Sequence, residues 1–406
     1  MISMDTNSVN SSGAVIKVIG VGGSGGNAVN NMIEKGLTGV EFIAANTDKQ
    51  ALDNNLAPIK IQLGRETTKG LGAGANPEVG KASLEESTDE VKEVLKGADM
   101  VFVTCGMGGG TGTGSAPYIA KIALEQNSLV VGIVTKPFIF EGKVRNQIAD
   151  VWLEEFRKNV DALIVISNQR LLEIIDKNTS FKEAFLKVDE VLYNATRGIS
   201  DMISTHGLMN VDFADVRTIM KGMGNAIMGI GVANGENRAK EATQKALNSP
   251  LLDGTCIAGA KGLLVNITGS DSMGMLEVAE AVELVNNAAG EGSNLIHGVN
   301  YKEEMGDDFM VTIVATGFNM NNEEVAVDES EEDIEFTLPK MTDTVKAKAP
   351  TGPNDLRKYD TPPAIRNKVN LGEQNTARIN KLFNTKFEPD SKNVQQTPTF
   401  IRRMMD

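Results

Sequence analysis

The stretch GMGGGTGTGSAP, residues 106–117, decides the predicted fold of this chain. It follows an apolar run, Ala98 to Cys105, that predicts a buried strand, and it precedes residues 118–124, whose apolar positions have helical spacing. The glycines therefore stand at a strand-to-helix turn, where backbone N–H groups and the positive end of the helix dipole can face an anion. Thr111 and Thr113 add hydroxyl donors. The alternative is a flexible surface loop, but linkers are not usually held between a buried strand and a helix.

Two further glycine-rich loops follow predicted strands. One, Gly20 to Asn27, comes after the strand of residues 14–20, and the other, residues 69–77, follows the short strand of residues 59–63. Strands and helices alternate up to residue 166, which predicts a parallel, doubly wound α/β sheet. Ligands of such sheets bind beyond the carboxyl ends of the strands, where all three loops fall. Together the loops predict a site for a phosphate-bearing ligand.

A long amphipathic helix is predicted next, because apolar residues from Phe181 to Met202 recur at alternating spacings of four and three. Its length of roughly 35–40 Å suits a rod that joins two domains, although an ordinary buried helix is an alternative. Beyond it, strands and helices alternate again up to about Gly317. This pattern predicts a second α/β domain.

The composition changes after this point. Residues 323–335 carry eight acids and no base, which is typical of a solvated, disordered linker. The chain ends in a short apolar and basic island, residues 397–404, which predicts a peptide that docks in a groove of a partner, or else a ragged terminus. The predicted parts are a disordered N-terminus (1–13), a nucleotide-binding domain (14–180), a central helix (181–205), a second domain (206–318), a disordered acidic linker (319–393) and a docking peptide (394–406).

Composition excludes several classes of protein. The net charge of −14 argues against general nucleic-acid binding and against a basic membrane-binding face. No apolar run reaches the ~18–20 residues of a membrane span, and the first 13 residues lack the layout of a signal peptide, so we expect a cytoplasmic protein. With two cysteines and two histidines, neither a disulfide framework nor a zinc site is expected.

Two competing motifs share the first glycine loop. Gly20-x-Gly22-x-x-Gly25 matches the dinucleotide fingerprint, but a dehydrogenase would not need the other two loops. Gly22-x-Ser24-x-Gly26 matches the hydrolase nucleophile elbow, although Ser24 among glycines is better explained as a phosphate donor. No Walker-type sequence occurs, which excludes an ordinary P-loop NTPase.

Asp212 and Asp215 stand at a predicted helix start. Acids there can cap the helix, or they can polarise a water or hold the hydration shell of a cation. The sequence is compatible with both roles.

The glycine stretch 106–117 looks like the tubulin signature in its bacterial form. Together with residues 18–23, 70–78, 135–138 and 210–215 it resembles the FtsZ family of bacterial, tubulin-like cell-division GTPases. The resemblance covers about residues 14–318 and the terminal peptide. It implies a self-assembling GTPase that stacks head to tail into protofilaments, forms the scaffold of the division ring, and couples GTP hydrolysis to disassembly.

The resemblance also implies a set of nucleotide contacts. Residues Gly23–Asn27 and Gly110–Gly112 would hold the phosphates, and residues 73–75 would lie near the γ-phosphate. Other residues would line the phosphate and ribose side or read the guanine, which Phe185 would stack on. The implied GTP-binding residues are Gly23, Ser24, Gly25, Gly26, Asn27, Ala73, Gly74, Ala75, Gly110, Thr111, Gly112, Thr135, Glu141, Arg145, Asn168, Phe185 and Asp189.

By the same resemblance, Asn210, Asp212 and Asp215 would be catalytic. They would enter the nucleotide site of the next subunit, so that hydrolysis requires a filament. Mg²⁺ would accompany GTP or GDP, bound mainly through the nucleotide, and no metal site built by the protein itself is expected.

The terminal peptide matches the family's core at Pro398, Phe400, Ile401 and Arg402. This implies membrane-tethering adaptors and assembly regulators as partners through residues 397–404, without direct membrane insertion, and a place at the mid-cell division ring. The chain departs from the family at Thr397, where an acid is usual, and at Thr205-His206, where Arg-Pro is usual.

Two other functions remain as alternatives. One is a tubulin-like structural protein that binds GTP with little turnover. The other is an NAD-dependent oxidoreductase.

Overall fold

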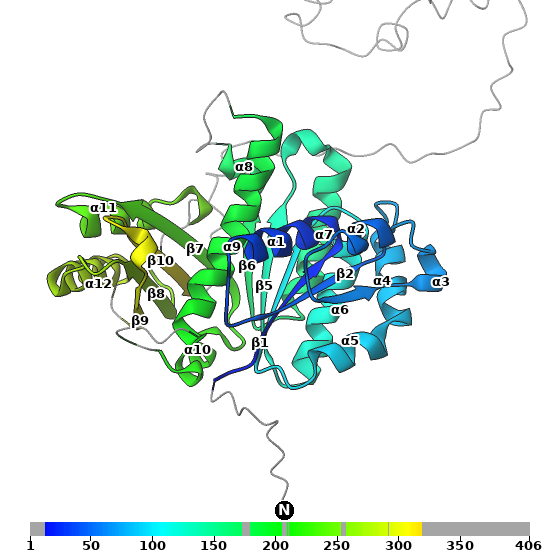
Figure 1. Ribbon diagram of the computed structural model, residues 1–406, viewed down its shortest axis with the longest axis horizontal. Helices are drawn as coiled ribbons and strands as arrows, with labels where there is room; N and C mark the ends of the chain where they lie inside the picture. The colour runs from blue at the N-terminus through cyan, green and yellow to red at the C-terminus, as the bar shows by residue number, and fades with distance from the viewer. Residues whose placement is uncertain are drawn as a thin grey trace, which may run out of the picture. The chain divides into compact units, whose positions relative to one another are not determined.

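A computed structural model describes residues 13–172, 179–204, 209, 211–252, 257–290 and 292–318. Within these residues, the strands form one sheet in the order β3-β2-β1-β4-β5-β6-β7-β10-β8-β9 (Figure 1). The strands are β1 Ile16–Val21, β2 Glu41–Asn46, β3 Ile59–Gln62, β4 Met100–Gly106, β5 Leu129–Lys136, β6 Ala162–Ser167, β7 Gly224–Ala233, β8 Gly262–Gly269, β9 Asn294–Tyr301 and β10 Phe309–Thr316.

Helices connect these strands and cover both faces of the sheet (Figure 1). In the first part of the chain they are α1 Gly22–Glu34, α2 Lys49–Asp53, α3 Arg65–Thr68, α4 Pro77–Glu86, α5 Thr88–Leu95, α6 Thr111–Glu125, η1 Ile139–Glu141, α7 Lys143–Arg157 and α8 Asn168–Leu171. Farther along they are α9 Phe181–Ser204, α10 Phe213–Met220, α11 Arg238–Leu247, η2 Pro250–Leu252, α12 Met275–Ala289 and η3 Glu303–Met305.

The first six strands are all parallel, as the alternation of strands and helices predicted. Along β1 the side chains alternate between the two faces of the sheet. Ile16 and Val18 belong to a core shared with α1, α9 and α10, whereas Ile19 and Val21 belong to a core shared with α4, α5, α6 and α7. The doubly wound fold of this part is therefore confirmed.

The second part of the chain extends the same sheet. β7 pairs parallel with β6 from Gly224 to Ala226, and β10 runs antiparallel to both β7 and β8. A third core lies among α11, α12 and these strands. Because the sheet continues through both parts, strand pairing marks no break at residues 181–205, and the domain limits stay predictions.

The predicted central helix is present as α9, which has 24 residues. It lies across the middle of the molecule between the two groups of strands (Figure 1). Gly198 allows a close approach, since an added Cβ there would lie 2.8 Å from the Thr312 side chain. The Asn266 amide also donates to the Gly198 carbonyl at 3.1 Å. α9 is thus both a connector and a buried element of the core.

Two helices begin earlier than predicted. α1 starts at Gly22, inside the glycine loop predicted over residues 20–27. α6 starts at Thr111, inside the glycine stretch, so that Pro117 lies within the helix rather than near its start. The reason is tertiary, because α6 lies directly on α4. An added Cβ on Gly114 would lie 1.9 Å from the Pro77 carbonyl oxygen, so only glycine permits this contact.

Candidate functional site

The glycine loop of residues 20–27 and the glycine stretch of residues 106–117 meet at the carboxyl ends of β1 and β4. Gly22, the first residue of α1, has a φ of +73°, and a Cβ there would lie 2.9 Å from the Gly112 nitrogen. A Cβ on Gly106 would lie 2.7 Å from the Ser24 hydroxyl oxygen. The absence of side chains therefore lets the starts of α1 and α6 lie together, and both helices direct their positive ends to the same place.

A cavity of about 340 Å³ opens at this place. Ten of the predicted GTP-binding residues line it, together with Val21, Gly22, Gly106, Met107, Gly109 and Pro137. The ten are Gly23, Ser24, Gly110, Thr111, Gly112, Thr135, Glu141, Arg145, Asn168 and Phe185. Residues far apart in the sequence thus converge on one cavity at the carboxyl edge of the parallel sheet.

Other predicted phosphate residues lie beside the cavity without lining it. Gly25 and Gly26 are buried in the first turn of α1, and Asn27 is exposed there. A Cβ on Gly25 would lie 2.4 Å from the Thr104 carbonyl oxygen, so this glycine lets α1 pack against β4. The contribution of Gly25 and Gly26 to an anion site is restricted to the backbone and the helix dipole.

The glycine loop of residues 69–77 packs against the glycine stretch of residues 106–117. A Cβ on Gly110 would lie 2.8 Å from the Ala73 Cβ, and the Asn76 nitrogen is almost as near. Ala73 is buried, whereas Gly74 and Ala75 are exposed and both have a φ of +58°. A positive φ at an alanine is strained, and such strain is typical of functional loops.

The opposite wall of the cavity contains polar side chains. The Arg145 guanidinium donates to the Glu141 carboxylate at 2.7 Å, and Thr135 is buried at the end of β5. Asn168 is also buried, and its Oδ1 has no hydrogen-bond partner among the described residues. An unsatisfied buried oxygen in a cavity wall is costly unless a ligand or a water supplies a donor. This wall therefore suits a polar ligand such as a nucleobase.

Asp189 lies one helical turn beyond Phe185 on α9 and does not line the cavity. Burial raises the pKa of its carboxyl group to about 7. A raised carboxyl pKa is common at functional sites, where burial removes water from a carboxylate that binds a ligand.

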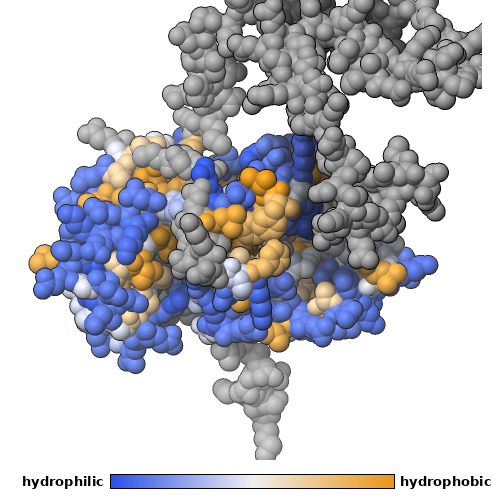
Figure 2. All heavy atoms as spheres, turned by 90° about the horizontal axis from the view of Figure 1, so that it is seen from above, coloured by the Kyte–Doolittle hydropathy of each residue, from blue (hydrophilic) through white to orange (hydrophobic). Residues whose placement is uncertain are grey.

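Four phenylalanines form a cluster around Phe185. The Phe138 ring stacks on Phe140 at 4.8 Å and meets the edge of Phe185 at 5.4 Å, and Phe181 contacts both Phe140 and Phe185. Phe140 and Phe181 are exposed. Figure 2 shows hydrophobic residues gathered near the middle of the face seen from above, between hydrophilic flanks. The cluster was not predicted from the sequence, since its members come from two segments about forty residues apart.

The predicted catalytic acids lie at the other edge of the sheet. Asp212 and Asp215 are exposed at the start of α10, and the Asp212 side chain makes no capping hydrogen bond there. Arg217 of α10 donates to the Asn127 carbonyl at 3.2 Å, and Asn127 precedes the amino end of β5. The cavity is at the carboxyl end of that strand, roughly 25 Å away at ~3.3 Å per residue. Within one chain, these acids cannot reach the cavity.

Some predictions fall outside the described residues. These are Asn210, the disordered segments and the docking residues Pro398, Phe400, Ile401 and Arg402.

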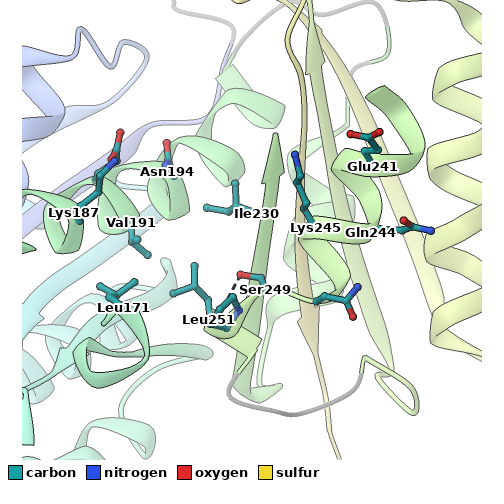
Figure 3. A pocket seen from close by; sticks show the side chains of 13 residues that line it. Leu171, Lys187, Val191, Asn194, Ile230, Glu241, Gln244, Lys245, Ser249 and Leu251 are labelled. Carbon is teal, nitrogen blue, oxygen red and sulfur yellow. Dashed lines mark hydrogen bonds and ion pairs between the residues drawn. The ribbon is translucent and has the colours of Figure 1, made fainter. Parts of the chain in front are cut away.

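A larger cavity of about 750 Å³ lies between α9, β7 and α11. Figure 3 shows that Leu171, Val191, Ile230 and Leu251 face its interior, while polar side chains of α9 and α11 form its rim. It contains none of the predicted site residues. Its apolar floor lacks the polar wall and the helix starts that make the smaller cavity suitable for an anion.

Two negative findings apply to the described part of the chain. No group of three or more His, Cys, Asp or Glu side chains there is arranged to hold a metal ion. No helix there combines the length and hydrophobicity that a membrane span requires.

Comparisons with known proteins agree with this geometry. Residues 15–176 match the GTPase domain of the Tubulin/FtsZ family, and residues 224–319 match the C-terminal domain of the FtsZ family. An empty FtsZ dimer from M. jannaschii is 43% identical, with a TM-score of 0.72 over 75% of this chain and 88% of that one. A mutant form of FtsZ from the same organism is also 43% identical, with a TM-score of 0.73 over 76% of this chain and 92% of that one.

A more distant structure shares the fold alone. CetZ2 from Haloferax volcanii, in a GTPγS-bound protofilament, is 23% identical, with a TM-score of 0.64 over 74% of this chain and 92% of that one.

The order of the first six strands, 3-2-1-4-5-6, is also that of dinucleotide-binding folds, so topology alone would not separate a GTPase from a dehydrogenase. The family matches do separate them, and nothing supports the oxidoreductase or the inactive structural alternative. The chain belongs to the Tubulin/FtsZ family, as an FtsZ-type, self-assembling, tubulin-like GTPase of cell division.

Proposed function

We propose that the cavity of about 340 Å³ is the GTP site and that its two helix starts hold the phosphates. Gly23 to Asn27 at the start of α1, and Gly110 to Gly112 at the start of α6, offer backbone N–H groups and two positive helix ends. Ser24 and Thr111 add hydroxyl donors. Ala73 lies against Gly110, and with Gly74 and Ala75 it approaches the γ-phosphate.

The other wall recognises the nucleoside. Phe185 stacks on the guanine, and the unsatisfied Asn168 oxygen accepts from its edge. Asp189 accepts a second hydrogen bond in its ionised form. Thr135, Glu141 and Arg145 line the ribose and phosphate side, where the ion pair orients the guanidinium.

Mg²⁺ fits this site only as a companion of the nucleotide. Among the described residues that line the cavity, Glu141 is the one carboxylate, and Arg145 already pairs with it. The phosphates of the nucleotide and water, and not side chains of this cavity, would therefore supply the ligands of the ion. When bound, it neutralises charge on the phosphates.

Hydrolysis takes place where two subunits meet. The single observation that supports this proposal is the position of Asp212 and Asp215, exposed at the sheet edge opposite the cavity. In a head-to-tail stack, the amino edge of one subunit faces the carboxyl edge of the next. Asp212 and Asp215, with Asn210, then orient the attacking water at the neighbour's γ-phosphate. Loss of that phosphate weakens the contact that the reaction required.

The assembled filament forms the scaffold of a division ring at mid-cell in the cytoplasm. Residues 397–404 dock on membrane-tethering adaptors and assembly regulators. The peptide's apolar pair, Phe400 and Ile401, and its basic neighbour Arg402 support this role.

A concentration series tests the shared site. GTP turnover per molecule should be near zero in dilute protein and rise steeply once filaments form. Constant turnover per molecule from dilute to concentrated protein would show that each subunit is active alone.

A mixing experiment identifies the two halves. Asp212→Ala should bind GTP as the unmodified chain does, yet hydrolyse little, and Arg145→Ala should bind poorly. An equal mixture should recover part of the turnover, because an intact pocket of the first variant can meet an intact Asp212 of the second. Loss of nucleotide binding in Asp212→Ala would contradict action on a neighbour.

A further inference from the structure

Thr47 is a buried residue that joins two of the glycine loops. It follows β2, and none of its surface is exposed. Its hydroxyl oxygen lies 2.6 Å from that of Thr111, the first residue of α6. Thr111 lines the GTP cavity, whereas Thr47 stands behind it.

The backbone of Thr47 forms hydrogen bonds with the glycine loop of residues 69–77 and with the helix before it. Its carbonyl accepts from the Gly72 nitrogen at 3.3 Å and from the Thr68 hydroxyl at 3.3 Å. The neighbouring Asp48 forms an isolated bridge with Leu71. Thr47 therefore forms hydrogen bonds both with the loop of residues 70–76 and with the start of α6, and so contributes to the spacing between them.

We propose that Thr47 is a positioning residue for the bound phosphates, acting through Thr111. This inference rests on the proposed GTP site. A phosphate only accepts hydrogen bonds, so the Thr111 hydroxyl must donate its single proton to the ligand. The Thr47 hydroxyl then donates to Thr111, and the two bonds strengthen each other in series.

The arrangement favours a triphosphate over a diphosphate. In the proposed site, Gly110 to Gly112 hold the phosphates in general, whereas Ala73 to Ala75 approach only the third. GTP therefore touches both loops at once, and its affinity depends on the spacing to which Thr47 contributes. GDP depends on that spacing less.

The test measures the affinity of the full chain for GDP and for a non-hydrolysable GTP analogue, at protein concentrations too low for filaments. Thr47→Val removes the hydroxyl and keeps the shape. It should lower the affinity for the GTP analogue by about 3- to 10-fold, as expected for the loss of one net hydrogen bond, and the affinity for GDP by less. Thr47→Ser keeps the hydroxyl and should bind within about twofold of the unmodified chain. At saturating GTP, kcat of Thr47→Val should stay near normal while KM rises.

Thr243→Val is the matched control. Thr243 is equally buried and donates to the Ala239 carbonyl at 2.7 Å, far from the cavity in the chain. This variant should change stability without changing nucleotide affinity. Thr47→Val placed in Thr111→Val should add no further loss, because the two hydroxyls act in series.

Each outcome decides the question. Normal binding by Thr47→Val, with weakened binding by Thr111→Val, overturns the positioning role and leaves the GTP site intact. Equal losses for GDP and GTP, or failure of Thr47→Ser to restore affinity, indicate a merely structural residue and also overturn it. If Thr47→Val does not fold, Thr47→Ala replaces it in the same comparison. Failure of the unmodified chain to bind either nucleotide would instead overturn the proposed site.

Discussion

At the scale of single residues, the proposed contact of Asp189 with guanine should make the affinity for GTP depend on pH. Its carboxyl group has a pKa raised to about 7 by burial, and the ionised form is the one that accepts hydrogen bonds from guanine. GTP affinity should therefore rise by up to about tenfold per pH unit toward pH 7 and level off above it. Titrations between about pH 5.5 and 8 at constant ionic strength measure this.

Asp189→Asn is the control for this prediction. It should bind GTP more weakly and lose this part of the pH dependence, while keeping any contribution from the phosphates.

The raised pKa of Asp189 also affects folding. The unfolded chain releases this proton near pH 4, whereas the nucleotide-free folded chain keeps it until about pH 7. Asp189 therefore removes stability as pH rises from about 4 to about 7. Identical pH profiles of GTP affinity for the unmodified chain and for Asp189→Asn would contradict the proposed contact of Asp189 with guanine.

At the scale of elements, the packing of α6 on α4 depends on glycines. A Cβ on Gly114 would lie 1.9 Å from the Pro77 carbonyl oxygen, and one on Gly80 would lie 2.4 Å from the Gly110 carbonyl oxygen. Gly114→Ala should lower the free energy of unfolding by about 1–3 kcal/mol, because the helices must separate. Denaturant unfolding of the full chain measures this change.

Gly109→Ala is its control. An added Cβ at Gly109 meets nothing within 4 Å, and this glycine is not among the positive-φ residues. Its free energy of unfolding should change by less than about 0.5 kcal/mol. Equal stability of the two variants would show that α6 and α4 can move apart without cost.

At the scale of the whole molecule, the terminal peptide and the GTPase should be separable. Removing residues 397–406 should leave GTP turnover and polymerisation unchanged, because both require only the cavity and the opposite edge of the sheet. Binding to adaptors should be abolished. Filament sedimentation and adaptor pull-down measure the two properties.

A point variant gives a sharper comparison. Phe400→Ala within the intact chain should reproduce the loss of adaptor binding, since it removes the largest apolar side chain of the peptide. A polymerisation defect in either variant would indicate that the peptide belongs to the filament and not to a docking site.

The elements and the site were predictable to different degrees. The three strands that precede the glycine loops were predicted within about two residues at either end, because apolar runs and the glycines that end them are local signals. The start of α6 was not, since glycine has a poor helix propensity and contact with α4 overrides it here. Ten of the seventeen predicted nucleotide residues line one cavity. Phe138, Phe140 and Thr47 were not predicted as site residues, because they have partners in other segments.

By itself, the sequence determined that three glycine-rich loops follow parallel strands and that the chain resembles a tubulin-like GTPase. Glycine spacing and hydrophobic periodicity are local properties, so short stretches of the sequence are enough to recognise them. Only the tertiary structure decided that Thr47 meets Thr111, 64 residues away, and that Asp212 and Asp215 lie at the edge opposite the cavity. Such relations depend on the order in which strands pair, and strand order arises from packing across the whole sheet, which no local pattern contains.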